Sequence, residues 1–258
     1  QTGKKAPVPR GRNGHSATLV LGGAAVPKAS VGGDSSSTGK ENKEKQLIYV
    51  FGGGSPMEGP SNDLYVLDVT LPDDVHWLPG PIAKAGLPPA AREMHSAVLG
   101  NDGRTIYIFG GQGLQGLHED LCPFDLATST WKNERFGAAK HARCGHVASA
   151  MRPNHMAVVG GFDGVNVCNT LMILNLDSTQ WTEASLKPSG PPTERFAHSA
   201  CMDPEKSFLY VYGGSNTSKE LNDLIRYDLS PAIEGEQVNQ DGDQIIVKQG
   251  RDEVQYAR

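Results

Sequence analysis

A double glycine recurs four times along this 258-residue chain, at Gly52-Gly53, Gly110-Gly111, Gly160-Gly161 and Gly213-Gly214. The steps between the second glycines are 58, 50 and 53 residues, so the spacing is nearly constant. A fixed period of about 50 residues predicts a repeat architecture, in which one supersecondary unit is copied and each copy buries its apolar surface against the next.

Each double glycine belongs to a longer recurring phrase. An Arg-x-x-His sequence precedes it, beginning at Arg12, Arg92, Arg143 and Arg195. A leucine follows the second glycine by ten or eleven residues, and an Asp or Asn stands four residues further on. A tryptophan closes three of the units, at Trp77, Trp131 and Trp181. From the His to the first glycine is 37 residues in the first unit and 14 or 15 in the others, which predicts an insertion in the first unit.

Each unit is predicted to form four short strands, A to D. Strand A follows the His, at 15–21, 95–99, 146–150 and 198–202. Strand B runs into the glycines at 47–51, 106–109, 156–159 and 208–212, and strand C begins at the leucine, at 64–67, 121–124, 171–174 and 224–227. The B runs are apolar throughout, as expected for strands buried on both faces. Four strands in a meander make one blade of a β-propeller, whereas a β-sandwich would not require a constant repeat.

The glycines and tryptophans have a steric interpretation in such a blade. At the end of strand B the chain must turn while packed against a neighbour, and residues without a Cβ allow positive φ and close backbone approach. Each tryptophan offers a large apolar surface that can fill the space between blades.

The phrases Arg-x-x-His-Ser, Tyr-x-Phe-Gly-Gly and Asn-Asp-Leu-x-x-x-Asp, followed by Trp, resemble the kelch repeat. The resemblance runs from about Arg12 to Asp228 in four registered copies. The third unit departs from it with Ala157 and Val159 in place of aromatic residues and Asn175 in place of Asp, and the fourth has no tryptophan. The resemblance implies a β-propeller, which in most such proteins binds other proteins.

We therefore predict one all-β, kelch-type β-propeller region over residues 1–258. The predicted blades are 12–77 with a disordered insertion at 22–46, 92–131, 143–181, and 195–248, where Ile245-Ile246-Val247 would supply the fourth strand. Kelch propellers usually have five to seven blades, so we expect further blades beyond these four. Completion of the ring by a partner, or a ring of four blades, are the alternatives.

The charge and composition of the chain limit the functions that we expect. A net charge of −5 and a pI near 5.9 give no electrostatic footprint for nucleic acid or an anionic membrane. Four single cysteines, without paired or metal-type spacing, indicate reduced thiols in an intracellular, cytoplasmic protein; an association with the cytoskeleton is compatible with this. The histidines show no ligand-like spacing, and no Ser/His/Asp or Cys/His arrangement is apparent. We expect no enzyme activity, metal or cofactor.

Gly111-Gln-Gly-Leu-Gln-Gly116 fits the G-x-G-x-x-G pattern of dinucleotide-binding loops. That mechanism needs a helix after the glycines, so that its N-terminus faces the pyrophosphate. A strand is predicted next, and the other units lack this spacing, so a glycine-rich loop is the better interpretation.

The recurring Arg positions carry two interpretations. A ring of cations around a central channel could hold an acidic peptide or a carboxylate. Alternatively, each Arg and His ties its own blade together by hydrogen bonds, and the equal treatment of every blade favours this scaffold role.

We predict that a partner protein docks on the face that collects the B–C and D–A loops. The B–C loops, at 54–61, 112–118, 162–168 and 215–220, are the least uniform parts of the repeat, and variable loops on a rigid scaffold are common recognition sites. The candidate residues are Arg12, Arg92, Arg143, Arg195, Met57, Glu58, Leu114, Gln115, His118, Phe162, Asp163, Asn166 and Asn216. Alternative functions are a substrate receptor of a ubiquitin ligase and a kelch-like carbohydrate-active enzyme, since the family resemblance extends to copper oxidases and sugar mutarotases.

Overall fold

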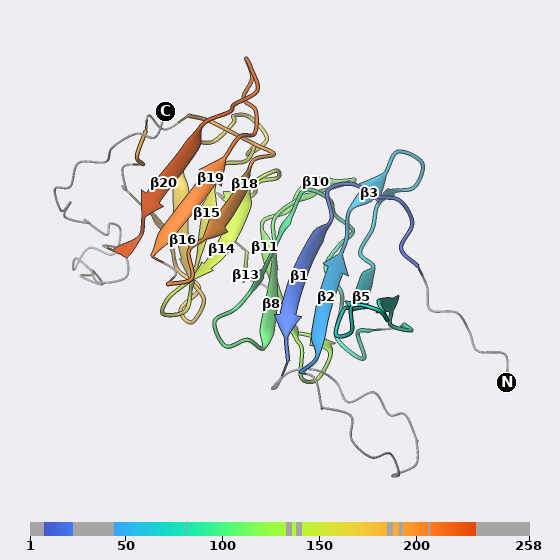
Figure 1. Ribbon diagram of the computed structural model, residues 1–258. Coiled ribbons are helices and arrows are strands. Elements are labelled where there is room, and N and C mark those ends of the chain that lie inside the picture. Colours follow the sequence, from blue (N-terminus) through green and yellow to red (C-terminus); the bar gives the residue numbers. More distant parts are fainter. Residues whose placement is uncertain are drawn as a thin grey trace, which may run out of the picture. The chain divides into compact units, whose positions relative to one another are not determined.

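The computed structural model describes residues 8–22, 44–80, 82–132, 136–137, 141–184, 188–190, 193–205 and 207–230. The elements that lie wholly within these ranges are β-strands, and Figure 1 shows the strands of each sheet side by side in chain order. The chain forms two compact units. Unit 1 comprises residues 1–109, 113–116 and 120–137, and unit 2 comprises residues 110–112, 117–119 and 138–258.

Unit 1 contains two antiparallel sheets that we call blades one and two. Blade one has the order β1-β2-β5-β6, with bounds Ser16–Leu21, Gln46–Phe51, Leu64–Asp68 and His76–Trp77. Blade two has the order β7-β8-β11-β12, with bounds Ser96–Leu99, Thr105–Phe109, Asp120–Asp125 and Thr130–Trp131. A further strand, β13 (Phe136–Gly137), pairs with the start of β11, and the sequence analysis did not foresee it.

Unit 2 contains blades three and four. Blade three has the order β14-β15-β16-β17, with bounds Val147–Met151, His155–Val159, Leu171–Asn175 and Trp181–Glu183. Blade four has the order β18-β19-β20, with bounds Ser199–Met202, Phe208–Tyr212 and Leu224–Asp228. The predicted fourth strand at 245–247, and residues 23–43 of the predicted insertion, lie outside the described residues.

The edge of β20 is bonded by the connection that precedes blade four. Ser189 donates its backbone N–H to the Arg226 carbonyl, and its hydroxyl accepts the Arg226 N–H at 3.0 Å. A similar connection in unit 1 runs beside β12, where Trp131 donates its N–H to the Ala85 carbonyl. The chain that links two blades therefore satisfies backbone groups at the edge of the second blade.

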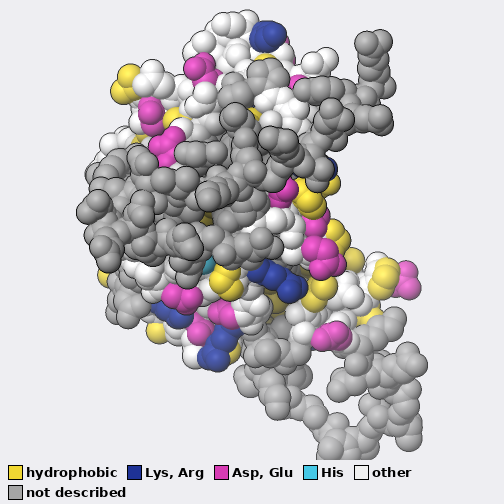
Figure 2. Space-filling model, turned by 90° about the vertical axis from the view of Figure 1, so that its left-hand side faces the viewer, with side chains coloured by type: hydrophobic (Ala, Val, Ile, Leu, Met, Phe, Trp, Pro, Cys, Tyr) yellow, Lys and Arg dark blue, Asp and Glu magenta, His cyan; other side chains and the backbone are white. Residues whose placement is uncertain are grey.

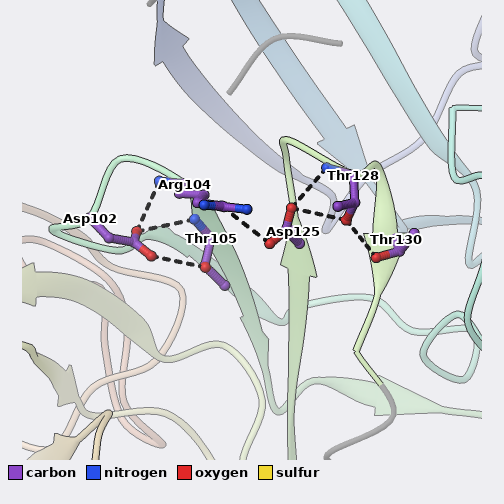
Figure 3. Close-up of polar contacts among 6 residues, drawn as sticks. All are labelled: Asp102, Arg104, Thr105, Asp125, Thr128 and Thr130. Atoms are coloured by element: carbon purple, nitrogen blue, oxygen red, sulfur yellow. Dashed lines mark hydrogen bonds and ion pairs between the residues drawn. The ribbon is translucent and has the colours of Figure 1, made fainter. Parts of the chain in front are cut away.

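The Asp or Asn that recurs after strand C caps the turn to strand D. Asp125 accepts the backbone N–H and the hydroxyl of Thr128 at 2.8 and 3.0 Å (Figure 3). Asn175 accepts the N–H groups of Asp177 and Ser178 at 2.9 and 3.0 Å. An amide oxygen accepts the same hydrogen bonds as a carboxylate in such a turn. The presence of Asn175 in place of Asp therefore leaves this turn of blade three intact.

Asp102 holds the A–B turn of blade two in the same way. One carboxylate oxygen accepts the N–H groups of Arg104 and Thr105, and the other accepts the Thr105 hydroxyl at 3.0 Å (Figure 3). Arg104 lies 3.4 Å from Asp125, which joins the A–B turn to the C–D turn at this end of the blade. Short polar side chains thus close both turns.

Each unit has its own core between its two blades. In unit 1 the core is rich in aromatic rings: the Trp131 ring lies 4.8 Å from Phe124 and 5.4 Å from Phe51 between ring centres. In unit 2 the core is mainly aliphatic, with Val159, Ile173 and Val211 among its buried members. Burial of such side chains stabilises each pair of blades by roughly 1.5–3 kcal/mol per large residue.

Candidate functional site

The double glycine is where one blade meets the next. Gly53 donates its backbone N–H to the Arg92 carbonyl of blade two at 2.9 Å. A Cβ on Gly52, at φ 63°, would lie 2.7 Å from that carbonyl oxygen and 2.8 Å from the His95 ring. The pair Gly160-Gly161 receives Arg195 and His198 of blade four in the same way. The prediction of positive φ and close backbone approach is confirmed.

The Arg side chains turn back into their own blades. In blade two, Arg92 is 0 % exposed and forms a two-pronged ion pair with Asp120, at 2.7 and 3.1 Å. In blade four, Arg195 is 2 % exposed, pairs with Asp223 at 2.7 and 3.1 Å, and donates to the Gly213 carbonyl at 2.9 Å. Paired, hydrogen-bonded burial is the condition under which a guanidinium is tolerated inside a protein.

Blades one and three vary this arrangement. Arg143 is 4 % exposed and donates to the Gly160 carbonyl at 3.0 Å, while Thr170 stands where Asp120 and Asp223 stand in the other blades. Burial lowers the pKa of Arg143. Arg12 is half-buried, donates to the Gly52 carbonyl at 2.9 Å and lies 5.1 Å from the centre of the Tyr65 ring.

Of the two interpretations of the Arg positions, these contacts favour the scaffold role within each blade. Three of the four guanidinium groups are buried and bound within their own blades, as the scaffold interpretation proposed. The Arg195 side chain, by its hydrogen bonds, lowers the pKa of Asp223, so this carboxylate is charged at neutral pH. The Arg positions therefore fix the bases of the B–C loops.

The B–C loops are small hairpins rather than irregular loops. In blade one, β3 (Gly54–Ser55) pairs with β4 (Gly59–Pro60), and in blade two β9 (Gln112–Gly113) pairs with β10 (Gly116–Leu117). Single bridges replace these strands in blades three and four, between Phe162 and Val167 and between Ser215 and Glu220. Every B–C loop therefore has a backbone-bonded stem, and its tip is presented on a fixed base.

Apolar side chains are exposed at the tips of three hairpins. Met57 is 93 % exposed in blade one, Leu114 is 89 % exposed in blade two, and Val165 is 81 % exposed in blade three. The tips of unit 1 adjoin each other, because a Cβ on Gly59 would lie 3.8 Å from Leu114. Met57 and Leu114 are among the residues predicted from the sequence, whereas Val165 is not.

The third predicted anchor, Phe162, has a different place. It is half-buried, and its backbone bridges both Cys144 and Val167 at the stem of the hairpin. A residue directly after a double glycine lies in the stem of the hairpin. The residue at the tip lies three or four positions after the second glycine. The signal that could have found Val165 is therefore the distance from the second glycine.

The polar candidates divide between tip and stem. Glu58 forms an ion pair with Arg10, and Gln115 is exposed beside Leu114. His118 is half-buried and donates its backbone N–H to the Gly111 carbonyl at 2.8 Å, so it belongs to the stem. Glu58 and Gln115 thus lie exposed at the tips, whereas His118 belongs to the base of its hairpin.

In unit 2, Asp163 and Asn216 close their hairpins. Asp163 accepts the N–H groups of Val165 and Asn166 at 2.8 and 2.7 Å, and hydrogen bonding, first from the Asn166 N–H, lowers the pKa of Asp163. Asn216 accepts the N–H groups of Ser218 and Lys219, both at 2.9 Å. These side-chain oxygens therefore stabilise the conformation of the two loops.

The G-x-G-x-x-G segment contains the β9–β10 hairpin and is followed by β11. It supplies no helix N-terminus, which is the feature that binds a pyrophosphate. Within the described ranges, no group of three or more His, Cys, Asp or Glu side chains could hold a metal ion. No helix in the described part of the chain is long and apolar enough to cross a membrane.

The surface charges are mixed in sign. On the face drawn in Figure 2, the described acidic and basic side chains are interspersed rather than gathered by sign. The described side chains on this face therefore form no large patch of one sign that would steer a strongly charged ligand.

Comparison with known proteins places the chain in a family. Residues 25–193 match the model of the KLHDC2/KLHL20/DRC7 Kelch-repeats domain. The chain is 30 % identical over 183 residues to the human (Homo sapiens) Kelch domain-containing protein 1, which covers 67 % of this chain and 43 % of that protein. It is 30 % identical over 199 residues to the Dynein alpha chain, flagellar outer arm, of Chlamydomonas reinhardtii, covering 72 % of this chain and 4 % of that protein.

A third relative is the Tip elongation aberrant protein 1 of Schizosaccharomyces pombe, 30 % identical over 193 residues, with 70 % of this chain and 16 % of that protein covered. The chain spans less than half the length of each of these relatives. The repeated sheets, the glycine joints between blades and the matched family model agree, and the chain belongs to the kelch-repeat family of β-propellers.

Proposed function

We propose that this chain is a non-catalytic protein-interaction module that binds its partner through the tips of the B–C hairpins. The observation that carries the proposal is the pair of exposed apolar side chains, Met57 and Leu114, on adjoining hairpins of unit 1. Large apolar side chains are costly to leave in water, and anchors of this kind supply much of the energy of protein interfaces.

The stems make these tips effective anchors. Ser61 donates its N–H to the Gly53 carbonyl at 2.8 Å, and His118 does the same to Gly111 at 2.8 Å. Hairpins bonded at both limbs lose little conformational freedom on binding, so less of the contact energy is spent on ordering. A flat polar rim around the tips, with Glu58 and Gln115, would supply orientation.

The family supports a binding role over catalysis. Kelch repeats are in general interaction modules without enzyme activity, and one relative is the Dynein alpha chain, flagellar outer arm, of Chlamydomonas reinhardtii. We therefore expect the partner to be a protein, held within an assembly of more than two chains.

The test compares two double variants in capture experiments with extracts of the source cells. Met57→Ser with Leu114→Ser removes both apolar tips of unit 1. Leu71→Ser with Val75→Ser removes two other exposed apolar side chains of the same unit, 44 % and 51 % exposed, and is the matched control. Bound proteins are quantified by mass spectrometry, and thermal unfolding verifies that both variants fold.

We expect the tip variant to lose at least about tenfold of one specific partner, because truncating an anchor typically costs more than 1 kcal/mol. The control should retain that partner. Equal capture by wild type and the tip variant would contradict the proposal, and so would equal loss in both variants.

A further inference from the structure

The six methionines of the chain all lie among the described residues, and one of them differs from the rest. Met57, at the tip of the blade-one hairpin, is 93 % exposed. Met94 and Met202 are half-buried, and Met202 packs against the core of unit 2. The remaining three are buried within blade three: Met151, Met156 and Met172. The molecule therefore offers one thioether to solvent at nearly full exposure.

The backbone of the hairpin keeps Met57 in this position. The strands β3 and β4 pair on either side of the turn, with Ser55 opposite Gly59. Within the turn, the Ser55 hydroxyl accepts the backbone N–H of Glu58 at 3.2 Å. Pro56 restricts the backbone directly before Met57, because its ring fixes φ. The turn is therefore closed from both sides, and the Met57 side chain is left in solvent.

The exposure belongs to the tip position, since other hairpins show it too. Val165 lies four residues after its second glycine, as Met57 does, and is 81 % exposed in blade three. Leu114 is exposed at the tip of blade two. Val and Leu side chains are hydrocarbons, whereas the methionine sulfur is polarizable and is oxidised to a sulfoxide. Among these three apolar tips, Met57 alone thus combines the exposure of an anchor with a reactive atom.

From this position we infer that Met57 is an oxidation site, and that its conversion to the sulfoxide switches off binding at the tips of unit 1. The oxidant is hydrogen peroxide. A sulfur lone pair attacks one peroxide oxygen, the O–O bond breaks as the S–O bond forms, and proton transfer releases water. The sulfur loses two electrons and the peroxide gains them. The loss of binding rests on the proposed function, whereas the oxidation of Met57 does not.

Oxidation changes what the tip offers to a partner. The sulfoxide replaces an apolar thioether by a polar, chiral group whose oxygen accepts hydrogen bonds. In an interface built on Met57 and Leu114, that oxygen would be desolvated among apolar atoms, because the two hairpins adjoin each other at Gly59. Methionine sulfoxide reductases reverse the change, one enzyme for each epimer at sulfur, so the tip can return to its binding form.

The first measurement locates the oxidation. The complete chain is treated with dilute hydrogen peroxide, and peptide mass spectrometry follows the gain of one oxygen at each methionine. We expect Met57 to react at least about tenfold faster than the three buried methionines, because those sulfurs are reached only when blade three opens. In urea the six rates should become similar, which is the control for sequence effects. A Met57 rate no higher than those of Met94 and Met202 overturns the assignment of the site.

The second measurement follows capture of the partner that the Met57→Ser, Leu114→Ser variant loses. Peroxide should lower capture by wild type at least about tenfold, and methionine sulfoxide reductases should restore it. Met57→Leu has no sulfur at the tip, so the ratio of its capture after and before peroxide should stay near one. Met202→Leu is the matched control, because it removes a half-buried methionine with little change of volume and should stay sensitive.

Both single variants keep the four cysteines, so oxidation of thiols affects them and wild type alike. Loss of capture by Met57→Leu after peroxide, or unchanged capture by oxidised wild type, overturns the switch and leaves the proposed function intact. Equal capture by wild type and the tip variant without peroxide contradicts the proposed function and the switch together, and the oxidation rates still decide the site.

Discussion

The joint between blades in unit 1 and the joint in unit 2 share a backbone and differ in their side chains. In unit 1, His95 bonds the Ser16 hydroxyl at 2.8 Å, and its ring lies 5.3 Å from the centre of Phe51. In unit 2, Val147 occupies the position of Ser16, and Val159 that of Phe51. Neither ring nitrogen of His198 has a hydrogen bond of good geometry with a described residue.

Comparing the two joints shows which features both of them have and which features one of them lacks. Both joints keep the glycine without a Cβ and the bond to the Arg carbonyl, at 2.9 Å in unit 1 and 2.8 Å in unit 2. The hydroxyl and the aromatic ring are absent from unit 2, which still forms the same joint. Unit 2 therefore keeps the joint although His198 lacks the hydroxyl partner that Ser16 gives His95.

The largest effect is expected from a methyl group at the joint itself. In Gly160→Ala the Cβ would lie 2.6 Å from the Arg195 carbonyl at a φ of 63°. Steric overlap with backbone adds to left-handed strain, and we expect a loss of about 3 kcal/mol or more of unfolding free energy, measured by urea denaturation.

Gly213→Ala is the control for this change. Its φ of 66° imposes the same strain, but the nearest atom to its Cβ is at 3.3 Å. This variant should lose only about 1–2 kcal/mol. Equal losses at the two glycines would show that the blade-to-blade contact does not set the requirement.

The next effect is a dependence on pH. Burial, followed by the charge of Arg195, lowers the pKa of His198 from 6.5 to about 4, and the Val159 backbone opposes this weakly. The unfolded chain therefore takes up a proton at a higher pH than the folded chain. Stability should fall as the pH drops from 6.5 to 4, by about 3 kcal/mol in all.

Urea denaturation from pH 7 to 4, compared between wild type and His198→Gln, isolates this contribution. The carboxylates with lowered pKa values, such as Asp223, begin to lose their contributions as the pH falls below about 5. Wild type and variant share this loss, so the difference between their profiles reports His198. Identical pH profiles for wild type and variant would contradict the assignment to His198.

A smaller effect is expected from exchanging the residues that distinguish the joints. Ser16→Val removes the hydroxyl bound to His95 and should cost about 1–2 kcal/mol at pH 7. Val147→Ser supplies a hydroxyl near His198 that can accept from the protonated ring, so the pKa of His198 should rise, as measured by NMR titration. If the pKa of His198 stays near 4 in this variant, the lack of a hydroxyl at position 147 does not contribute to the lowering of that pKa.

The smallest effect concerns the third position of the Arg-x-x-His phrase. It is left-handed in every blade, with φ of 61° and 62° at Gly14 and Gly145 but also 56° at Met94 and 54° at Ala197. Ala197→Gly should relieve this strain and raise the thermal midpoint, by up to about 1 kcal/mol in stability. The same change at Ala148, within strand β14, should lower it.

Much of the fold was predictable because it is local and repeated. The predicted strands A, B and C agree with the observed ones to within about one residue at each end, since each apolar run is bounded by the His, the glycines or the capping Asp. The short strand β13 was not predictable, because its two residues carry no pattern and pair only through the backbone.

The candidate site could be predicted from the sequence less completely than the fold. The composition of the loops indicated that they vary, but it did not reveal that each has a bonded stem, which places Phe162 at the base and Val165 at the tip. The sequence also left open where the recurring Arg side chains point. At such a position a cation can face a partner or a carboxylate of its own blade.

By itself, the sequence determined the number of recognisable sheets, their strand order and the glycine positions, because a two-residue alternation and a 50-residue period are properties of the chain. The tertiary structure alone decided that Arg92 meets Asp120, 28 residues away, and that Gly160 packs against the Arg195 carbonyl. The reason is physical: burial and ion pairing depend on which surfaces come together in space.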